Sequence, residues 1–271
     1  MRNKLLIAYF LLFLTLSIFN VASEHNKLLI GFLYLSTFIF EVSAVYSAIS
    51  AYGIKHPLGR SFAFICVGFT AAASGQIIWF YLRYIENINP FPSIADIFYL
   101  LAYIFIFIGY ILMLRSLKLH WEKRYLEVLL LALLVAVSMG ILVFHFEIIT
   151  ILQTGGPFLD KAITIAYGIN DLVLIVMVLF ILRTAIEYKK GDIFRPWIAI
   201  FFAQFLVLIG DILFSIFSKE YAKDISPYNL IAVVWFVANL LVIYGYYGFS
   251  DILKKAQDEM IFQVVSKKKD K

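Results

Sequence analysis

The chain has 271 residues, of which 63% are hydrophobic, 18% are aromatic and only 15% are charged, whereas a soluble domain is about half apolar and about a quarter charged. This composition excludes a soluble globular domain and favours a membrane protein. The net charge of +5 does not indicate a nucleic-acid partner, because the basic residues lie between apolar stretches rather than on one folded face.

Eight apolar stretches of about twenty residues follow one another along the chain. Because hydrocarbon offers no partner to an unpaired N–H or C=O group, runs of this length cross a bilayer as helices. We therefore predict an all-α fold, a polytopic transmembrane helical bundle of about eight helices. The predicted helices cover residues 4–22, 28–52, 61–84, 94–114, 125–149, 163–182, 197–217 and 229–249. Residues 1–250 form the predicted bundle, and residues 251–271 form a basic cytoplasmic tail.

The first stretch has two interpretations. The basic start at Arg2 and Lys4, the apolar core and the sequence Val21-Ala22-Ser23 are typical of a secretory signal peptide, whose removal would leave seven helices. The apolar core continues through Phe19, which makes it longer than the roughly 7–15 residues usual in signal peptides. We therefore favour a retained first helix.

Lys and Arg residues are distributed unequally between the two sides of the predicted bundle. Of the 23 basic residues, 18 lie at the N-terminus, in the second, fourth and sixth loops, or after the last helix. Cytoplasmic flanks of membrane helices are enriched in Lys and Arg. The sequence thus predicts a multi-pass protein of the cell membrane with both termini in the cytoplasm.

The acidic residues Glu41, Asp96, Asp171 and Asp211 lie within the predicted spans. An ionisable side chain at membrane depth costs about 2.5 kcal/mol or more, so such residues tend to face the bundle interior and to mark functional sites. At a rise of about 1.5 Å per residue, Asp171 and Asp211 lie about 12 Å and about 9 Å from the outer ends of their helices. Glu41 lies deeper, near the middle of its helix.

Other polar residues, Gln76 on the third span and His145 on the fifth, occupy the same outer depth. We predict a ligand-binding cavity that opens outward between the third, fourth, sixth and seventh helices and has an aromatic lining that includes Trp79. Its predicted ligand-binding residues are Asp96, Asp171, Asp211, Gln76, Tyr99, Tyr103, Tyr167 and Arg83. Repulsion among the acids favours a cationic or hydrogen-bond-donating ligand over an anion.

Each acid also has a purely structural interpretation. It is strongest for Asp96, because Ser93 and Asp96 stand where a helix begins, Ser93 as a cap and Asp96 as an acid in the first turn. A metal site could draw on His145, Glu147 and the three aspartates, but these residues do not have the spacing of metal ligands. The sequence predicts no metal, no other cofactor and no catalytic residue, since phosphate-binding loops, dinucleotide fingerprints and nucleophile elbows are missing as well.

Three spans share a short theme in which a small or polar residue precedes Asp: Ala95-Asp96, Asn170-Asp171 and Gly210-Asp211. The theme is either a weak internal repeat or three independent solutions to the burial of an acid.

A longer motif runs from Trp79 to Glu86 and on through Pro90-Phe91-Pro92-Ser93-Ile94-Ala95-Asp96-Ile97-Phe98-Tyr99-Leu100 and Tyr103. It resembles the P-x-P-S-x-A-D-x-x-Y-L stretch in the multi-pass N-terminal membrane regions of some prokaryotic diguanylate cyclases and sensor histidine kinases. Ala166-Tyr167-Gly168-Ile169-Asn170-Asp171 is similar to the A-Y-P-x-x-D stretch of that family, with Gly168 in place of proline. The segments 208–211 and 235–247 are similar to its last helices, so the resemblance covers residues 60–250.

This resemblance implies a membrane sensor. Those proteins continue into a cyclase or kinase domain, whereas this sequence ends at Lys271. We therefore expect a stand-alone sensor or ligand-binding module that works with a separate cytoplasmic signalling partner, the lipid bilayer and an unidentified small molecule, and not with nucleic acid. A small-solute or proton-coupled transporter is the first alternative, and an intramembrane enzyme is the second. A sensor binds without flux, a transporter moves solute and an enzyme turns it over.

Overall fold

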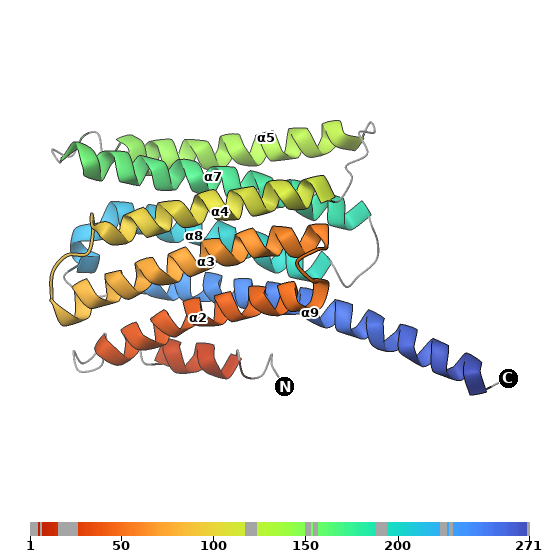
Figure 1. Ribbon diagram of the computed structural model, residues 1–271. Coiled ribbons are helices and arrows are strands. Elements are labelled where there is room, and N and C mark those ends of the chain that lie inside the picture. Colours follow the sequence, from red (N-terminus) through yellow and green to blue (C-terminus); the bar gives the residue numbers. More distant parts are fainter. Residues whose placement is uncertain are drawn as a thin grey trace.

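The computed structural model describes residues 5, 7–15, 27–116, 124–149, 153, 157–187, 194–222, 227 and 230–269. Its elements in chain order are α2 (Lys27–Tyr52), α3 (Pro57–Phe80), the π-helix η2 (Tyr81–Ile85), α4 (Ile94–Ser116), α5 (Arg124–Leu142), the π-helix η3 (Val143–Ile149), α7 (Phe158–Glu187), α8 (Phe194–Ala222) and α9 (Ile231–Lys269). Residues 7–15 form a further helix. The regular structure of the described residues is entirely helical, which confirms the predicted all-α bundle (Figure 1).

Six of the described helices are long and apolar enough to cross a membrane: α2, α3 together with η2, α4, α7, α8 and α9. The helix of α5 and η3 contains a shorter apolar stretch, Leu130–Phe146. The chain is therefore a multi-pass membrane protein whose surroundings are a lipid bilayer. Of the first predicted span, the part that the structure describes is residue 5 and the helix over residues 7–15.

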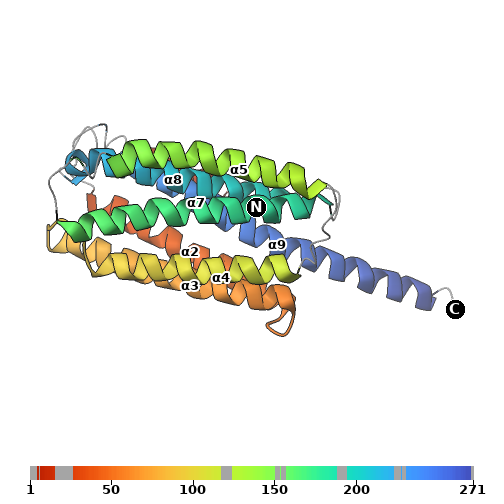
Figure 2. The same cartoon turned by 90° about the horizontal axis from the view of Figure 1, so that it is seen from above.

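The six long helices form a closed ring. In order around it, α2 packs against α3, α3 against α4, α4 against α7, α7 against α8, α8 against α9, and α9 returns to α2. The α5 helix packs on α7 and lies at the edge of the bundle in both views (Figures 1 and 2). The predicted tail continues α9 as one helix, which extends beyond the other helices.

The turn between α2 and α3 follows from its local sequence. Gly53 adopts φ of 78° directly after α2 and donates its backbone N–H to Ile49 O at 2.7 Å. Such a left-handed residue ends a helix by satisfying one of its last carbonyl groups. His56 Nδ1 then accepts from Leu58 N at 3.2 Å, and Pro57 takes the first position of α3. The α3 helix thus begins at Pro57 rather than at the predicted residue 61.

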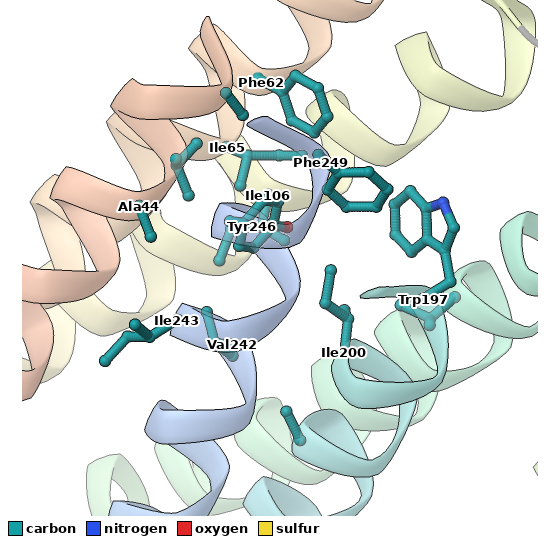
Figure 3. Packing of buried hydrophobic residues seen from close by; sticks show 14 of the residues in the cluster. Ala44, Phe62, Ile65, Ile106, Trp197, Ile200, Val242, Ile243, Tyr246 and Phe249 are labelled. Carbon is teal, nitrogen blue, oxygen red and sulfur yellow. The ribbon is translucent and has the colours of Figure 1, made fainter. Parts of the chain in front are cut away.

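Large apolar side chains fill the half of the ring that adjoins this turn. Phe62, Trp197, Tyr246 and Phe249, from α3, α8 and α9, are at most 3% exposed (Figure 3). Ala44 brings α2 close to the same cluster. Phe13, from the helix over residues 7–15, belongs to the same cluster of buried residues. It is fully buried and stacks on Phe236, with ring centroids 3.7 Å apart.

Helices α3 and α4 approach each other closely at glycine. A Cβ atom on Gly109 of α4 would lie 2.4 Å from Ile65 Cγ1 and 2.9 Å from Ser61 O of α3. Small residues permit this kind of contact between membrane helices, where dispersion rather than hydrophobic burial favours association.

A pair of identical substitutions tests this contact. Gly109→Ala should lower the free energy of unfolding by about 1–3 kcal/mol, because its methyl group overlaps α3. Gly140→Ala on α5 should leave stability unchanged or raise it by about 0.5–1 kcal/mol, because the nearest atom to its Cβ, in Leu172, is 4.0 Å away. Thermal unfolding in detergent gives both values, and a Gly109→Ala protein as stable as Gly140→Ala would contradict the close approach.

Candidate functional site

A cavity of about 270 Å³ lies inside the ring, and all six ring helices contribute to its wall. Three acids line it, Glu41, Asp96 and Asp211, together with three amides, Gln76, Gln204 and Asn239. The aromatic part of the wall consists of Tyr34, Phe38, Phe69, Trp79, Phe91, Tyr99, Tyr103, Tyr110, Tyr167, Phe214, Tyr221 and Trp235. No Lys or Arg lines the cavity in the part of the chain that the structure describes.

The lining residues recur at helical spacing, so each helix presents one face to the cavity. On α2 they are residues 34, 38 and 41, and on α9 they are residues 235, 239 and 242. Positions three or four residues apart lie on the same side of a helix. Ile106, Tyr110, Ile200 and Val242 belong both to the wall and to the apolar core, so the core closes the cavity at that end.

Two crossed hydrogen bonds join α4 and α7. The hydroxyl of Tyr167 on α7 donates to Asp96 Oδ1 on α4 at 2.7 Å, and the hydroxyl of Tyr103 on α4 donates to Asp171 Oδ1 on α7 at 2.6 Å. Asp96 also accepts from Ser93 N at 2.7 Å, while Ser93 Oγ accepts from Ala95 N at 3.1 Å. These reciprocal bonds form a capping box at the start of α4. Asp96 therefore both caps its helix and lines the cavity.

The Asp171 side chain continues the network to the next two helices. It lies beside the carboxyl group of Asp211 on α8, and Asp211 Oδ1 accepts from Trp235 Nε1 on α9 at 2.8 Å. Gly210 leaves room for the indole, since a Cβ there would lie 2.3 Å from Trp235 Nε1.

The two buried amides make the remaining links across the ring. Tyr99 of α4 donates its hydroxyl to Gln76 Oε1 of α3 at 2.6 Å. With its amide nitrogen facing Glu41, Asn239 of α9 donates to Glu41 Oε1 of α2 at 3.2 Å and accepts from Thr37 Oγ1 at 2.8 Å. Neighbouring helices are thus joined by polar side chains at membrane depth, where an unsatisfied polar group is costly.

Arg83 lies at the end of the cavity opposite the apolar core. Its guanidinium carbon is 4.9 Å from the ring centre of Trp79 and 4.3 Å from that of Tyr221, and its Nη2 donates to Tyr221 O at 2.9 Å. Arg83 belongs to the π-helix η2, and α8 departs from helical geometry at Phe217. Arg83 therefore joins α3 to α8. These two helices face each other across the cavity, and each is irregular near this contact.

The structure brings most of the predicted site residues together. Asp96, Asp211, Gln76, Tyr99, Tyr103, Tyr167 and Trp79 line the cavity. Asp171 is fully buried behind its wall, accepts a hydrogen bond from the lining residue Tyr103 and lies beside Asp211, and Arg83 contacts two lining rings.

His145, which has the same outer depth as the predicted site residues, does not line the cavity. This residue lies exposed on η3 and packs edge-on against Phe146. Depth along a helix does not say which way a side chain points, and the helix that carries His145 lies outside the ring. Among the described residues, no three His, Cys, Asp or Glu side chains are arranged as metal ligands.

Several lining residues were not predicted, above all Glu41, Asn239, Tyr34 and Trp235. Glu41 is 2% exposed and faces the cavity from α2. The signal that could have found it is the common helix face of residues 34, 38 and 41. The cavity therefore lies between six helices rather than between the four expected from the depth of the aspartates.

The fold and the cavity together define the class of this chain: a polytopic helical membrane protein with an internal cavity of acids and aromatic rings. Comparisons with protein-family models, with curated proteins and with solved structures find no match.

The network leads to a prediction about Asp171. In Asp171→Asn, the amide oxygen can still accept from Tyr103, so the free energy of unfolding should change by less than about 1 kcal/mol. Asp171→Leu should lower it by about 1–3 kcal/mol, because the buried Tyr103 hydroxyl loses its acceptor. Melting temperatures of both variants measure the difference, and equal losses would contradict the proposed bonds.

Proposed function

We propose that this chain is a membrane sensor whose cavity binds a small molecule. The proposal rests on the construction of the cavity. Six helices arranged in a ring surround buried acids and aromatic side chains, and large apolar side chains close one end. Small-molecule sites are typically concave, mostly apolar and furnished with a few convergent polar groups. A volume of about 270 Å³ suits a small ligand.

The direction of the cavity follows from the distribution of charge. The loop 53–56 adjoins the apolar core, and the loop 86–93 adjoins the opposite end of the ring. The count of basic residues assigns the first loop to the cytoplasm and the second to the outside of the cell membrane. The cavity then faces outward, and the helical extension of α9 is available to a separate cytoplasmic signalling partner.

The resemblance to sensor regions agrees with this proposal. The motif around Asp96 that carries the resemblance forms the start of α4, including the capping box and the lining residue Tyr99. The similar stretch at residues 166–171 supplies Tyr167 and Asp171, the partners of that same helix. The parts of the sequence that resemble the sensors are thus parts of one site.

A proton-coupled transporter is the second candidate. The proximity of the Asp171 and Asp211 side chains favours it, because two neighbouring carboxyl groups can share a proton and release it when a cation arrives. The packed apolar core argues for the sensor, since solute flux would require Phe62, Trp197, Tyr246 and Phe249 to separate.

The orientation leads to one prediction. With Cys66 replaced by Ala, a cysteine introduced as Ile88→Cys should react with a membrane-impermeant maleimide on intact cells. A cysteine introduced as Lys55→Cys should react only after permeabilisation, because its loop is predicted to be cytoplasmic. Both side chains are exposed, so accessibility rather than burial decides the result. The reverse pattern would place the cavity on the cytoplasmic side.

The cavity itself leads to another prediction. In a panel of small cations, anions and neutral molecules, at least one compound should raise the melting temperature of the purified protein. The same compound should have no effect on Ala72→Phe, whose ring would enter the cavity from α3. Ile77→Phe on the exposed side of α3 is the matched control and should respond like the native chain.

The same compounds also separate the sensor from the transporter. In proteoliposomes, a sensor ligand should bind without accumulating and without dissipating a pH gradient, whereas a substrate of a proton-coupled transporter would do both. If no compound shifts the melting temperature in a way that depends on Ala72, the proposed ligand-binding function is wrong.

A further inference from the structure

The charged residues around the cavity determine whether it favours a cation or an anion. Glu41, Asp96 and Asp211 line the wall, and Asp171 lies directly behind it, whereas no Lys or Arg lines it among the described residues. The basic residue at its end, Arg83, already contacts two aromatic rings and a backbone carbonyl. Four acids thus face one base, so a cation lowers the electrostatic free energy of the site and an anion raises it.

The hydrogen bonds that the acids already accept bear on the kind of cation that the cavity favours. Every acid in the wall already accepts from a protein donor: Asp96 from Tyr167, Asp211 from Trp235, and Glu41 from Asn239. These bonds fix the orientation of the carboxyl groups and use part of their capacity to accept, since an ionised carboxylate has about four acceptor positions. The acids therefore offer negative charge together with the acceptor positions that remain.

The aromatic rings of the cavity provide favourable contacts for a cation that has no N–H groups. Twelve rings line the cavity, and they come from every helix of the ring. A cation over the face of Trp or Tyr is attracted by the ring quadrupole, and quaternary ammonium groups are bound in aromatic cages for this reason. The protein's own Arg83 shows the geometry at one end, because its guanidinium lies over Trp79 and Tyr221, both of which line the cavity.

One buried donor indicates a second feature of the ligand. Gln76 is 3% exposed and lines the cavity, and its Oε1 accepts from Tyr99. Its Nε2 has no hydrogen-bond partner among the residues that the structure describes. Leaving a buried donor unpaired costs about 1–3 kcal/mol, so a ligand oxygen that accepts this hydrogen bond recovers a large part of that free energy.

We propose that the cavity binds an alkylated ammonium ion that also carries an oxygen acceptor. The aromatic faces and the bonded acids hold the ammonium group, and Gln76 Nε2 donates to the oxygen. This inference rests on the proposed ligand-binding function and adds the chemical class of the ligand to it.

Three probes of nearly equal shape test the two features separately. Choline has both the cationic group and the hydroxyl oxygen; 3,3-dimethylbutan-1-ol replaces the nitrogen by carbon and is neutral; propyltrimethylammonium replaces the hydroxyl by a methyl group. Calorimetric titration of the full chain in nanodiscs of phosphatidylglycerol should give a Kd for choline at least about tenfold lower than for the neutral alcohol. The Kd for choline should also be about threefold to tenfold lower than the Kd for propyltrimethylammonium.

A matched pair of variants assigns the oxygen contact. Gln76→Met removes the donor, so choline and propyltrimethylammonium should bind it equally. Tyr99→Phe removes the hydroxyl that bonds to Gln76 Oε1 but leaves Nε2 in place, so the preference for choline should persist. The anion 3,3-dimethylbutanoate should bind neither the native chain nor the variants. Short-chain phosphatidylcholine serves as a competitor: displacement of choline would assign the ammonium group to a lipid headgroup, and no displacement would assign it to a free solute.

The outcomes separate this inference from the function on which it rests. If the neutral alcohol or the anion binds as tightly as choline and its effect is lost in Ala72→Phe, the cavity is a binding site and the inferred ligand class is wrong. If no compound of any charge binds in a way that depends on Ala72, the proposed function fails together with the inference.

Discussion

Hydrogen bonds between side chains of neighbouring helices are the constraint on which this structure depends. Around the ring, Gln76 and Tyr99 join α3 to α4, Tyr103 and Asp171 join α4 to α7, Trp235 joins α8 to α9, and Asn239 joins α9 to α2. Each such bond stabilises a membrane protein by only about 0.6 kcal/mol on average, but a polar group left unpaired in hydrocarbon costs several times more. The polar side chains therefore favour this order of helices over others.

The same constraint divides the bundle into two halves. Where the polar groups meet, the side chains must keep the distances of hydrogen bonds, and a space of about 270 Å³ remains between them. Where the lining is apolar, no direction is imposed, and Phe62, Trp197, Tyr246 and Phe249 pack together without such a space. Glycine at the α3–α4 and α8–α9 contacts permits the close approach that the closed ring requires.

Much of this architecture could be predicted from the sequence, because apolar length and helix depth are local properties. The helical class, the positions of the long helices and the convergence of Asp96, Asp171 and Asp211 follow from them. The order of helices around the ring does not, since it depends on contacts between residues far apart in sequence, such as Asn239 with Glu41. For this reason the part that α2 and α9 take in the cavity was not foreseen.

The three Asp motifs show why a structural and a functional role need not exclude each other. Asp96 closes a capping box, Asp171 accepts a hydrogen bond from Tyr103 of the neighbouring helix, and Gly210 makes room for the indole that donates to Asp211. These are three different local solutions rather than one repeated unit.

In each motif a hydrogen bond fixes the orientation of a carboxyl group at or beside the cavity wall. Because the carboxyl group is already oriented, ligand binding does not have to spend free energy on reorienting it. A loss of stability in a variant of these acids would therefore not argue against binding. Only a substitution that keeps the bonds and changes the charge, as Asp171→Asn does, can separate the two roles.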